Sequence, residues 1–235
     1  MKKIYRKIKP LFYSGKEKRH ALVGPPKKWQ MKRQFQIDFL TEKGLLPDHY
    51  LLDIGCGTLR GGVPLIAYLD AGHYHGIEAR ADVLQEGEKE LADHNLTDKS
   101  PVLTAASDLA PVELNQKFDF IWSFSVLIHM ADEIVEGAFA LVNNHIADDG
   151  SFYANVNFGK REDAEWQGFP VVFRSESFYR EMAARHDLQM EIVGDLKSLG
   201  HHSGSEGQDS QVMLRFFREM KLSLIHISEP TRLDD

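Results

Sequence analysis

A glycine-rich turn that follows an apolar run most constrains what this chain can fold into. Residues 51–62 read Leu-Leu-Asp-Ile-Gly-Cys-Gly-Thr-Leu-Arg-Gly-Gly. The apolar start predicts a buried strand. The glycines predict a turn whose backbone a ligand can approach more closely than a Cβ would allow. A helix that begins near Gly61 would present its first backbone amides to that ligand.

The spacing of this turn and its acid indicate the kind of ligand. Dinucleotide-binding turns follow G-x-G-x-x-G, whereas here Gly61 comes one residue too late. Asp53 lies two residues before Gly55 and would be unfavourable beside a pyrophosphate. Its carboxylate suits a ligand that carries a cation, such as the ammonium of a methionine moiety. Both features argue against a nucleotide-linked oxidoreductase.

Predicted strands and helices alternate along the chain. Helical patterns cover residues 29–42, 61–69, 81–94, 132–145 and 175–186. Apolar runs predict strands at residues 50–54, 74–78, 102–105, 118–123, 152–157, 190–193 and 212–217. Such alternation predicts a parallel sheet with helices on both faces, and ligands bind such sheets beyond the carboxyl ends of the strands.

These features together resemble the class I S-adenosylmethionine-dependent methyltransferases, whose first motif is D/E-x-G-x-G. Asp53, Gly55 and Gly57 match that motif, and the resemblance covers about residues 45–217. It implies an α/β, Rossmann-like fold with a seven-stranded, mostly parallel sheet covered by helices on both faces. The last strand would run antiparallel between the fifth and the sixth. S-adenosyl-L-methionine is then the implied cofactor.

The resemblance assigns further residues to the cofactor. Glu78 ends the second strand, where the family has an acid that accepts hydrogen bonds from the ribose diol, and Ala79 follows it. Asp108 and Leu109 follow the third strand, where the family contacts the adenine. An Asp in this position could equally cap a short helical turn.

Two more residues complete the predicted cofactor site. Residues 118–123 resemble the fourth motif of the family, whose end lies beneath the transferred methyl group, and this places Ser123 there. Cys56 lies within the first motif, where a small buried side chain is the simplest interpretation.

Methyl transfer is an in-line displacement, so the alignment of the two reactants contributes roughly 7–11 kcal/mol. For a hydroxyl nucleophile a general base adds about 10²–10⁴-fold. His129 follows the fourth strand, and His201 and His202 lie in the loop before the last strand, so these are the candidate catalytic residues. The alternative for His129 is a structural role, and the alternative for His201 and His202 is a solvated polar loop. No third ligand at metal-binding spacing accompanies the adjacent pair, so no metal is predicted.

Basic and acidic residues are distributed unevenly along the chain. The first 33 residues hold 12 Lys or Arg and one acid, whereas the remainder holds 16 basic and 34 acidic residues. The acidic body argues against a nucleic-acid partner. We expect a basic arm over residues 1–28 and a methyltransferase domain over residues 29–221. The arm is either a poorly ordered tail or a short helix in weak contact with an anionic membrane surface through Ile4, Tyr5, Ile8, Leu11 and Phe12.

No function is assigned to residues 222–235 at the end of the chain. Residues 222–232 resemble a translated sequencing adapter, so residues 222–235 are predicted to be an artefactual tail. The single cysteine and the absence of an apolar leader at the N-terminus favour a cytoplasmic location.

The expected function is S-adenosylmethionine-dependent methyl transfer to a hydroxyl or amine of a small-molecule acceptor, with a sugar or a lipid-linked intermediate as candidates. The alternative is a regulatory or partner subunit that binds S-adenosylmethionine without catalysis.

Overall fold

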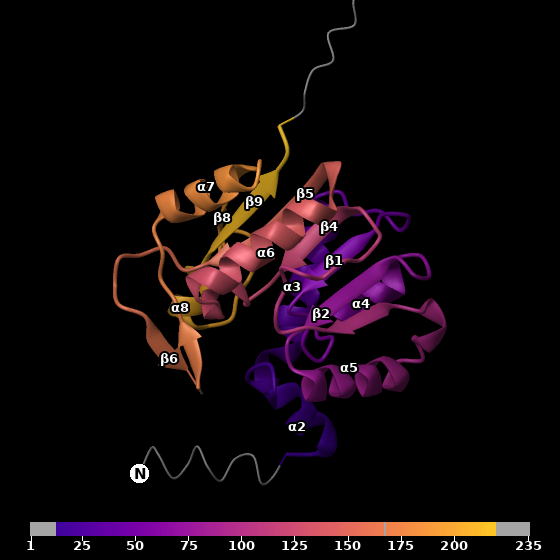
Figure 1. Cartoon of the computed structure of the whole chain (residues 1–235). Coiled ribbons are helices and arrows are strands. Elements are labelled where there is room, and N and C mark those ends of the chain that lie inside the picture. The colour runs from indigo at the N-terminus through magenta and orange to yellow at the C-terminus, as the bar shows by residue number, and fades with distance from the viewer. Residues whose placement is uncertain (1–12, 167, 220–235) are drawn as a thin grey trace, which may run out of the picture.

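Seven strands form one mixed sheet in the computed structural model, which describes residues 13–166 and 168–219 (Figure 1). The strand order is β3-β2-β1-β4-β5-β9-β8. Neighbours from β3 to β5 pair in parallel, whereas β9 runs antiparallel to both β5 and β8. The predicted topology is therefore confirmed. The strands are β1 (Leu51–Ile54), β2 (Tyr74–Glu78), β3 (Val102–Ala105), β4 (Phe118–Ser123), β5 (Ile146–Val156), β8 (Gln189–Asp195) and β9 (Val212–Phe217).

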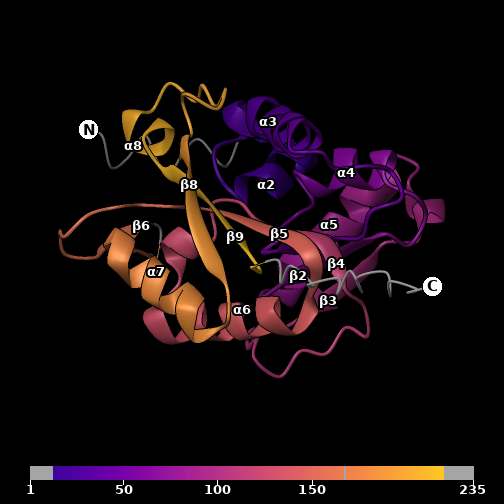
Figure 2. The same cartoon turned by 90° about the horizontal axis from the view of Figure 1, so that it is seen from above.

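Helices cover both faces of the sheet, as Figure 2 shows from above. One face carries α3 (Trp29–Glu42), α4 (Gly62–Tyr68) and α5 (Ala81–Asp93), and the other carries α6 (Asp132–His145) and α7 (Glu176–Arg185). Each face has its own apolar core. Parallel strands buried between two such layers need apolar side chains on both faces, which explains the nearly continuous apolar sequence of β1 and β4.

Two features near β5 differ from the sequence prediction. The strand predicted over residues 152–157 begins earlier, at Ile146, and its pairing register with β4 shifts within the added segment. A Cβ at Gly150 would lie 2.7 Å from the carbonyl oxygen of Phe118, so the strand needs a glycine there. A small hairpin of β6 (Ala164–Trp166) and β7 (Phe169–Val171) follows and was not predicted. The polar loop before β9 contains the short α8 (Glu206–Asp209).

Residues 13–28 are the described part of the predicted basic arm, and they form a short helix and a 3₁₀ turn. Ser14 caps α2 (Gly15–Ala21) through a capping box with Glu17, and a 3₁₀ turn (Pro26–Lys28) leads into α3. Arg19 pairs with acids on α5, which holds α2 against the domain; these acids are Glu86, Glu90 and Asp93.

Two sequence predictions lie outside the described residues. They are the membrane contact of residues 4–12 and the artefactual tail at residues 222–235. Within the described ranges, no helix is both long and apolar enough to cross a membrane.

Candidate active site

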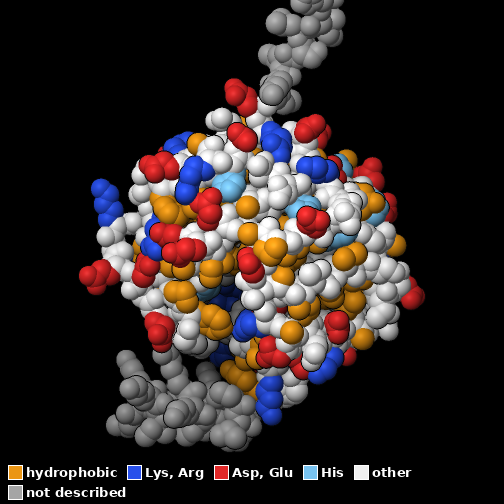
Figure 3. All heavy atoms as spheres, in the orientation of Figure 1, with side chains coloured by type: hydrophobic (Ala, Val, Ile, Leu, Met, Phe, Trp, Pro, Cys, Tyr) orange, Lys and Arg blue, Asp and Glu red, His pale blue; other side chains and the backbone are white. Residues whose placement is uncertain are grey.

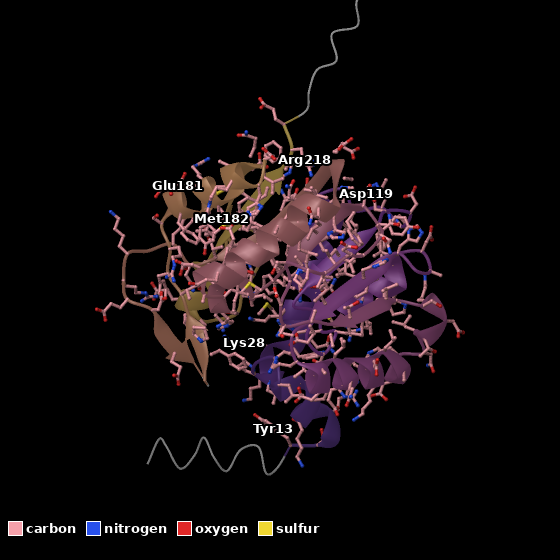
Figure 4. The ribbon with its side chains drawn as sticks, viewed as in Figure 1. Tyr13, Lys28, Asp119, Glu181, Met182 and Arg218 are labelled. Atoms are coloured by element: carbon pink, nitrogen blue, oxygen red, sulfur yellow. The ribbon has the colours of Figure 1, made fainter. Side chains whose placement is uncertain are left out.

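A cavity of about 480 Å³ lies beyond the carboxyl ends of the parallel strands. The glycine turn after β1 and the ends of β2 and β4 form its base, and residues 22–25 and the β6–β7 hairpin form its walls. Figure 3 shows the opening as a hollow with basic side chains inside and apolar side chains around it. Lys28, just before α3, lies near this opening (Figure 4).

The glycine turn is held in a conformation that side chains rarely adopt. Gly55 and Gly57 have φ values of 79° and 58°. The amides of Gly55 and Cys56 donate to the carbonyl oxygen of Ile77 at 2.8 and 3.0 Å, which fixes the turn on β2. A Cβ at Gly55 would collide with Val126. The turn therefore presents bare backbone to the cavity, as the sequence predicted.

Asp53 and Arg60 line a small adjoining cavity beside this turn. Asp53 is buried and accepts a hydrogen bond from the Tyr74 hydroxyl at 2.7 Å. Burial raises the pKa of Asp53 to about 7, although the Tyr74 hydrogen bond and the Arg60 charge oppose that rise. Arg60 donates from Nη1 to the carbonyl oxygen of Val23 at 2.9 Å, but its buried Nε has no partner. Burial lowers the pKa of Arg60 to about 10, so it stays cationic at neutral pH.

Glu78 is the acid at the carboxyl end of β2. Its Oε2 accepts from the Gly57 amide at 3.0 Å. Its Oε1 accepts from the backbone amide and Nε of Arg80 at 3.1 and 3.2 Å. Because it is buried and lines the cavity together with Ala79, its carboxylate is fixed at the floor of the site.

His129 lines the cavity from the 3₁₀ turn Leu127–His129 after β4. Its Nδ1 lies 2.6 Å from the carbonyl oxygen of Pro170 in β7. A carbonyl can only accept, so Nδ1 carries the proton and Nε2 is the basic nitrogen of the neutral ring. Burial lowers the pKa of His129, so the ring is neutral at neutral pH.

Lys32 is a cavity residue that the sequence analysis missed. It lies on α3 and is only 6% exposed, with Nζ 5.6 Å from the centre of the Phe124 ring. Burial, with the charges of Arg60 and Lys28, lowers its pKa to about 7. The signal was present in the sequence, because Lys32 shares the helical spacing of the buried residues Phe35 and Phe39.

Residues 52–152 match a family model described as a methyltransferase domain. This part of the chain, from β1 to β5, is therefore similar to methyltransferase domains. No relative is detected among curated proteins.

Solved structures of methyltransferases share the fold. A magnesium protoporphyrin IX methyltransferase from Synechocystis PCC 6803, with bound S-adenosylmethionine, has a TM-score of 0.62 and 18% identity, covering 91% of this chain and 96% of that chain. An S-adenosylmethionine-dependent methyltransferase from Clostridium acetobutylicum has a TM-score of 0.60 and 15% identity, covering 81% and 92%. A glycopeptide N-methyltransferase with bound S-adenosylhomocysteine has a TM-score of 0.60 and 13% identity, covering 78% and 88%.

The remaining residues predicted to contact the cofactor separate into two groups. Leu109 lines the main cavity and Cys56 lines the small one. Burial raises the pKa of the Cys56 thiol, so it stays protonated. Asp108 is exposed, does not line the cavity and accepts from the Ala110 amide at 3.2 Å, which is the alternative capping role. Ser123 is fully buried outside the lining and donates to the carbonyl oxygen of Ile54 at 3.2 Å.

The structure does not bring the other two predicted histidines to the cavity. His201 is fully buried, and its ring lies edge-on to Phe35 and Phe124. Its Nδ1 lies 3.0 Å from Oδ1 of Asp209, and burial lowers its pKa to about 4. His202 is exposed and outside the lining. The loop thus packs the His201 ring against Phe35 of α3 and against Phe124, which follows β4.

No group of three or more His, Cys, Asp or Glu side chains within the described ranges could hold a metal ion.

Proposed function

We propose that this methyltransferase binds S-adenosylmethionine over the glycine turn and transfers its methyl group to a hydroxyl or amine of a small-molecule acceptor. One observation carries the proposal. A single cavity is lined both by the glycine turn and Glu78 and by His129 and the β6–β7 hairpin. Two reactants can therefore meet in one cavity, which is what an in-line displacement requires.

The residues at the glycine turn fit this cofactor. The turn is a cradle that a Cβ would fill, and the Nε atom of Arg60 is buried without a partner. Asp53 would hold the ammonium of the methionine moiety and Arg60 its carboxylate, while Glu78 would accept from the ribose hydroxyls. Ala79 and Leu109 would pack against the adenine. When bound, the cofactor supplies a methyl group on a sulfonium, with a neutral thioether as leaving group.

The chain's own residues would align the acceptor and take up its proton. Phe124, Ile128 and Met130 line the cavity with apolar surface and would exclude water from the reacting atoms. The neutral His129 ring would accept the proton of an acceptor hydroxyl at Nε2 and contribute about 10²–10⁴-fold. His129 therefore remains the candidate base.

The acceptor is a small molecule in this proposal because the cavity volume falls in the range of small-molecule sites. The similar structures named above include enzymes for a porphyrin and for a glycopeptide, which also support such an acceptor. Sugars and lipid-linked intermediates are the first candidates to test.

Calorimetric titration of the full chain with S-adenosylmethionine, S-adenosylhomocysteine and NAD tests the cofactor. We expect the first two to bind and NAD not to bind. Binding of NAD alone by a protein that melts cooperatively would contradict the proposal. Transfer of a labelled methyl group to a panel of sugars, sugar acids and lipid phosphates then tests catalysis. Cofactor binding without transfer to any of them would favour the regulatory subunit.

A further inference from the structure

We propose that the acceptor carries an anionic group, a carboxylate or a phosphate, and that this group binds at Lys32. The inference rests on the proposed function and names the substrate class of the same cavity.

Lys32 is held in place by the helix that carries it. Gln36, one turn later on α3, accepts from Nε1 of the buried Trp122 at 2.9 Å and donates to the carbonyl oxygen of Lys32 at 3.0 Å. This contact ties α3 to β4 at the level of the cavity. The ammonium of Lys32 therefore enters the site from a rigid element rather than from a mobile surface loop.

The charges around Lys32 are unbalanced. Lys28 and Arg60 lie close enough to disfavour its charged form, and Asp209 is the one acid that favours it. Asp209 is already engaged, because it accepts from the Ser203 amide at 2.8 Å and lies 3.0 Å from Nδ1 of His201. No ion pair of Lys32 occurs within residues 13–166 and 168–219.

A buried ammonium that lacks a carboxylate is unfavourable unless a ligand supplies the anion. Burial lowers the pKa of Lys32 because the charged form is unfavourable there, and a bound anion would raise it again. The wider lining agrees: among the described residues, its cations are Lys32, Arg60, Arg80 and Arg161 and its one acid is Glu78.

The carboxylate of the cofactor is the competing partner for Lys32. Arg60 lines the small cavity beside Asp53, and Lys32 does not. Arg60 also has the unpartnered Nε there. Asp53 and Arg60 would thus bind the ammonium and the carboxylate of the cofactor. Lys32 is then available to bind the acceptor.

The surroundings of Lys32 indicate the rest of the acceptor. The ring of Phe124 lies beneath its ammonium, and Phe169 and Phe173 line the hairpin side of the cavity. The guanidinium of Arg161 lies 3.6 Å from the centre of the Phe173 ring and adds a second cation on that side. An acid with an apolar or aromatic body matches this lining.

The test uses the full chain saturated with S-adenosylhomocysteine, so that the cofactor's carboxylate already occupies its own site. Benzoate, phenyl phosphate and the neutral benzyl alcohol are titrated by calorimetry. We expect one or both anions to bind roughly tenfold or more tightly than the alcohol. Preference for benzoate would indicate a carboxylate acceptor, and preference for phenyl phosphate a phosphate.

Two variants and a matched control assign the effect to Lys32. Lys32→Met should lose the preference for anions, and Lys32→Arg should keep it because the charge remains. Lys43→Met is the control, since Lys43 Nζ also lies 5.6 Å from a phenylalanine ring, that of Phe39, but Lys43 is exposed and outside the cavity lining. A thermal melt of each variant confirms that it is folded.

The outcomes separate the two proposals. If the wild-type chain does not bind S-adenosylhomocysteine, the proposed function is wrong. If it binds this ligand but shows no preference for anions, the inference about the acceptor is wrong. It is also wrong if Lys32→Met weakens S-adenosylhomocysteine and leaves anion binding unchanged, because Lys32 would then hold the cofactor.

Discussion

The two ends of the cavity are built in different ways. The cofactor end consists of strand termini and the turns that directly follow them, with Asp53, Gly55 and Glu78 fixed by backbone and side-chain hydrogen bonds. The acceptor end is assembled from residues 22–25, Lys32 on α3, the β6–β7 hairpin and the residues around α8. The sheet thus determines the first end, whereas packing of distant segments determines the second. We expect substitutions at the two ends to affect different measurable steps.

The largest expected effect is on turnover. His129→Gln should lower the rate of methyl transfer to a hydroxyl acceptor by about 10²–10⁴-fold, because the base is lost. S-adenosylhomocysteine affinity should change little, since His129 lies on the acceptor side. His202→Gln is the matched control, because His202 is exposed and outside the lining.

The pH profile sharpens this prediction. A base acts in its neutral form, and burial lowers the pKa of His129 below its usual value. The rate should therefore be level at neutral pH and fall only on the acid side of the ordinary histidine range. A rate that His129→Gln leaves unchanged would remove His129 from the chemistry and leave alignment as the main contribution.

A smaller effect is expected at the cofactor end. Asp53→Asn keeps an oxygen that can accept from Tyr74 but removes the charge that would face the ammonium. S-adenosylmethionine affinity should fall roughly tenfold to a hundredfold, as expected for the loss of a hydrogen bond to a charged group. Calorimetry measures this directly.

The same variant tests the titration of Asp53. Burial raises the pKa of Asp53 to about 7, so below that pH the carboxyl group must lose a proton before it can hold a cation. Wild-type affinity should therefore weaken as the pH falls below about 7, and the affinity of Asp53→Asn should not. Equal pH dependence in both proteins would show that Asp53 does not hold the cofactor's ammonium.

The difference between the two ends also explains what the sequence could predict. The strands of the main sheet and the glycine turn are local patterns of apolar runs and glycines, and the structure has them close to where the sequence predicts. The antiparallel place of the last strand was instead implied by the family resemblance, and it is confirmed. Lys32 was missed because a lysine among polar residues looks solvated until α3 is placed against β4. Asp108 was assigned to the site from the family resemblance and His201 from its place in the loop before the last strand, but loops turn side chains away from a cavity as readily as toward it. Only the packed loop geometry decides this.

The smallest expected effect concerns the loop that holds His201. Its pKa of about 4 lies below the usual 6.5 because of burial, so the unfolded chain binds more protons between these two values. This contribution to stability is present above about pH 6.5 and is lost as the pH falls toward 4. Its full size is at most about 3.5 kcal/mol, from roughly 1.4 kcal/mol for each tenfold difference in proton affinity between the folded and unfolded chain.

His201→Asn isolates this contribution while keeping a donor toward Asp209. Urea unfolding at pH 7 and pH 5 should show a smaller acid-side loss of stability in the variant than in the wild-type chain. The comparison between proteins matters because Asp53, with its raised pKa, acts in the opposite sense over the same range. Asp209, with a pKa of about 2, contributes only at lower pH. The variant could instead keep the wild-type pH dependence of stability and lose methyl transfer. In that case His201 acts at the acceptor end of the cavity, and its part of the loop does more than stabilise the fold.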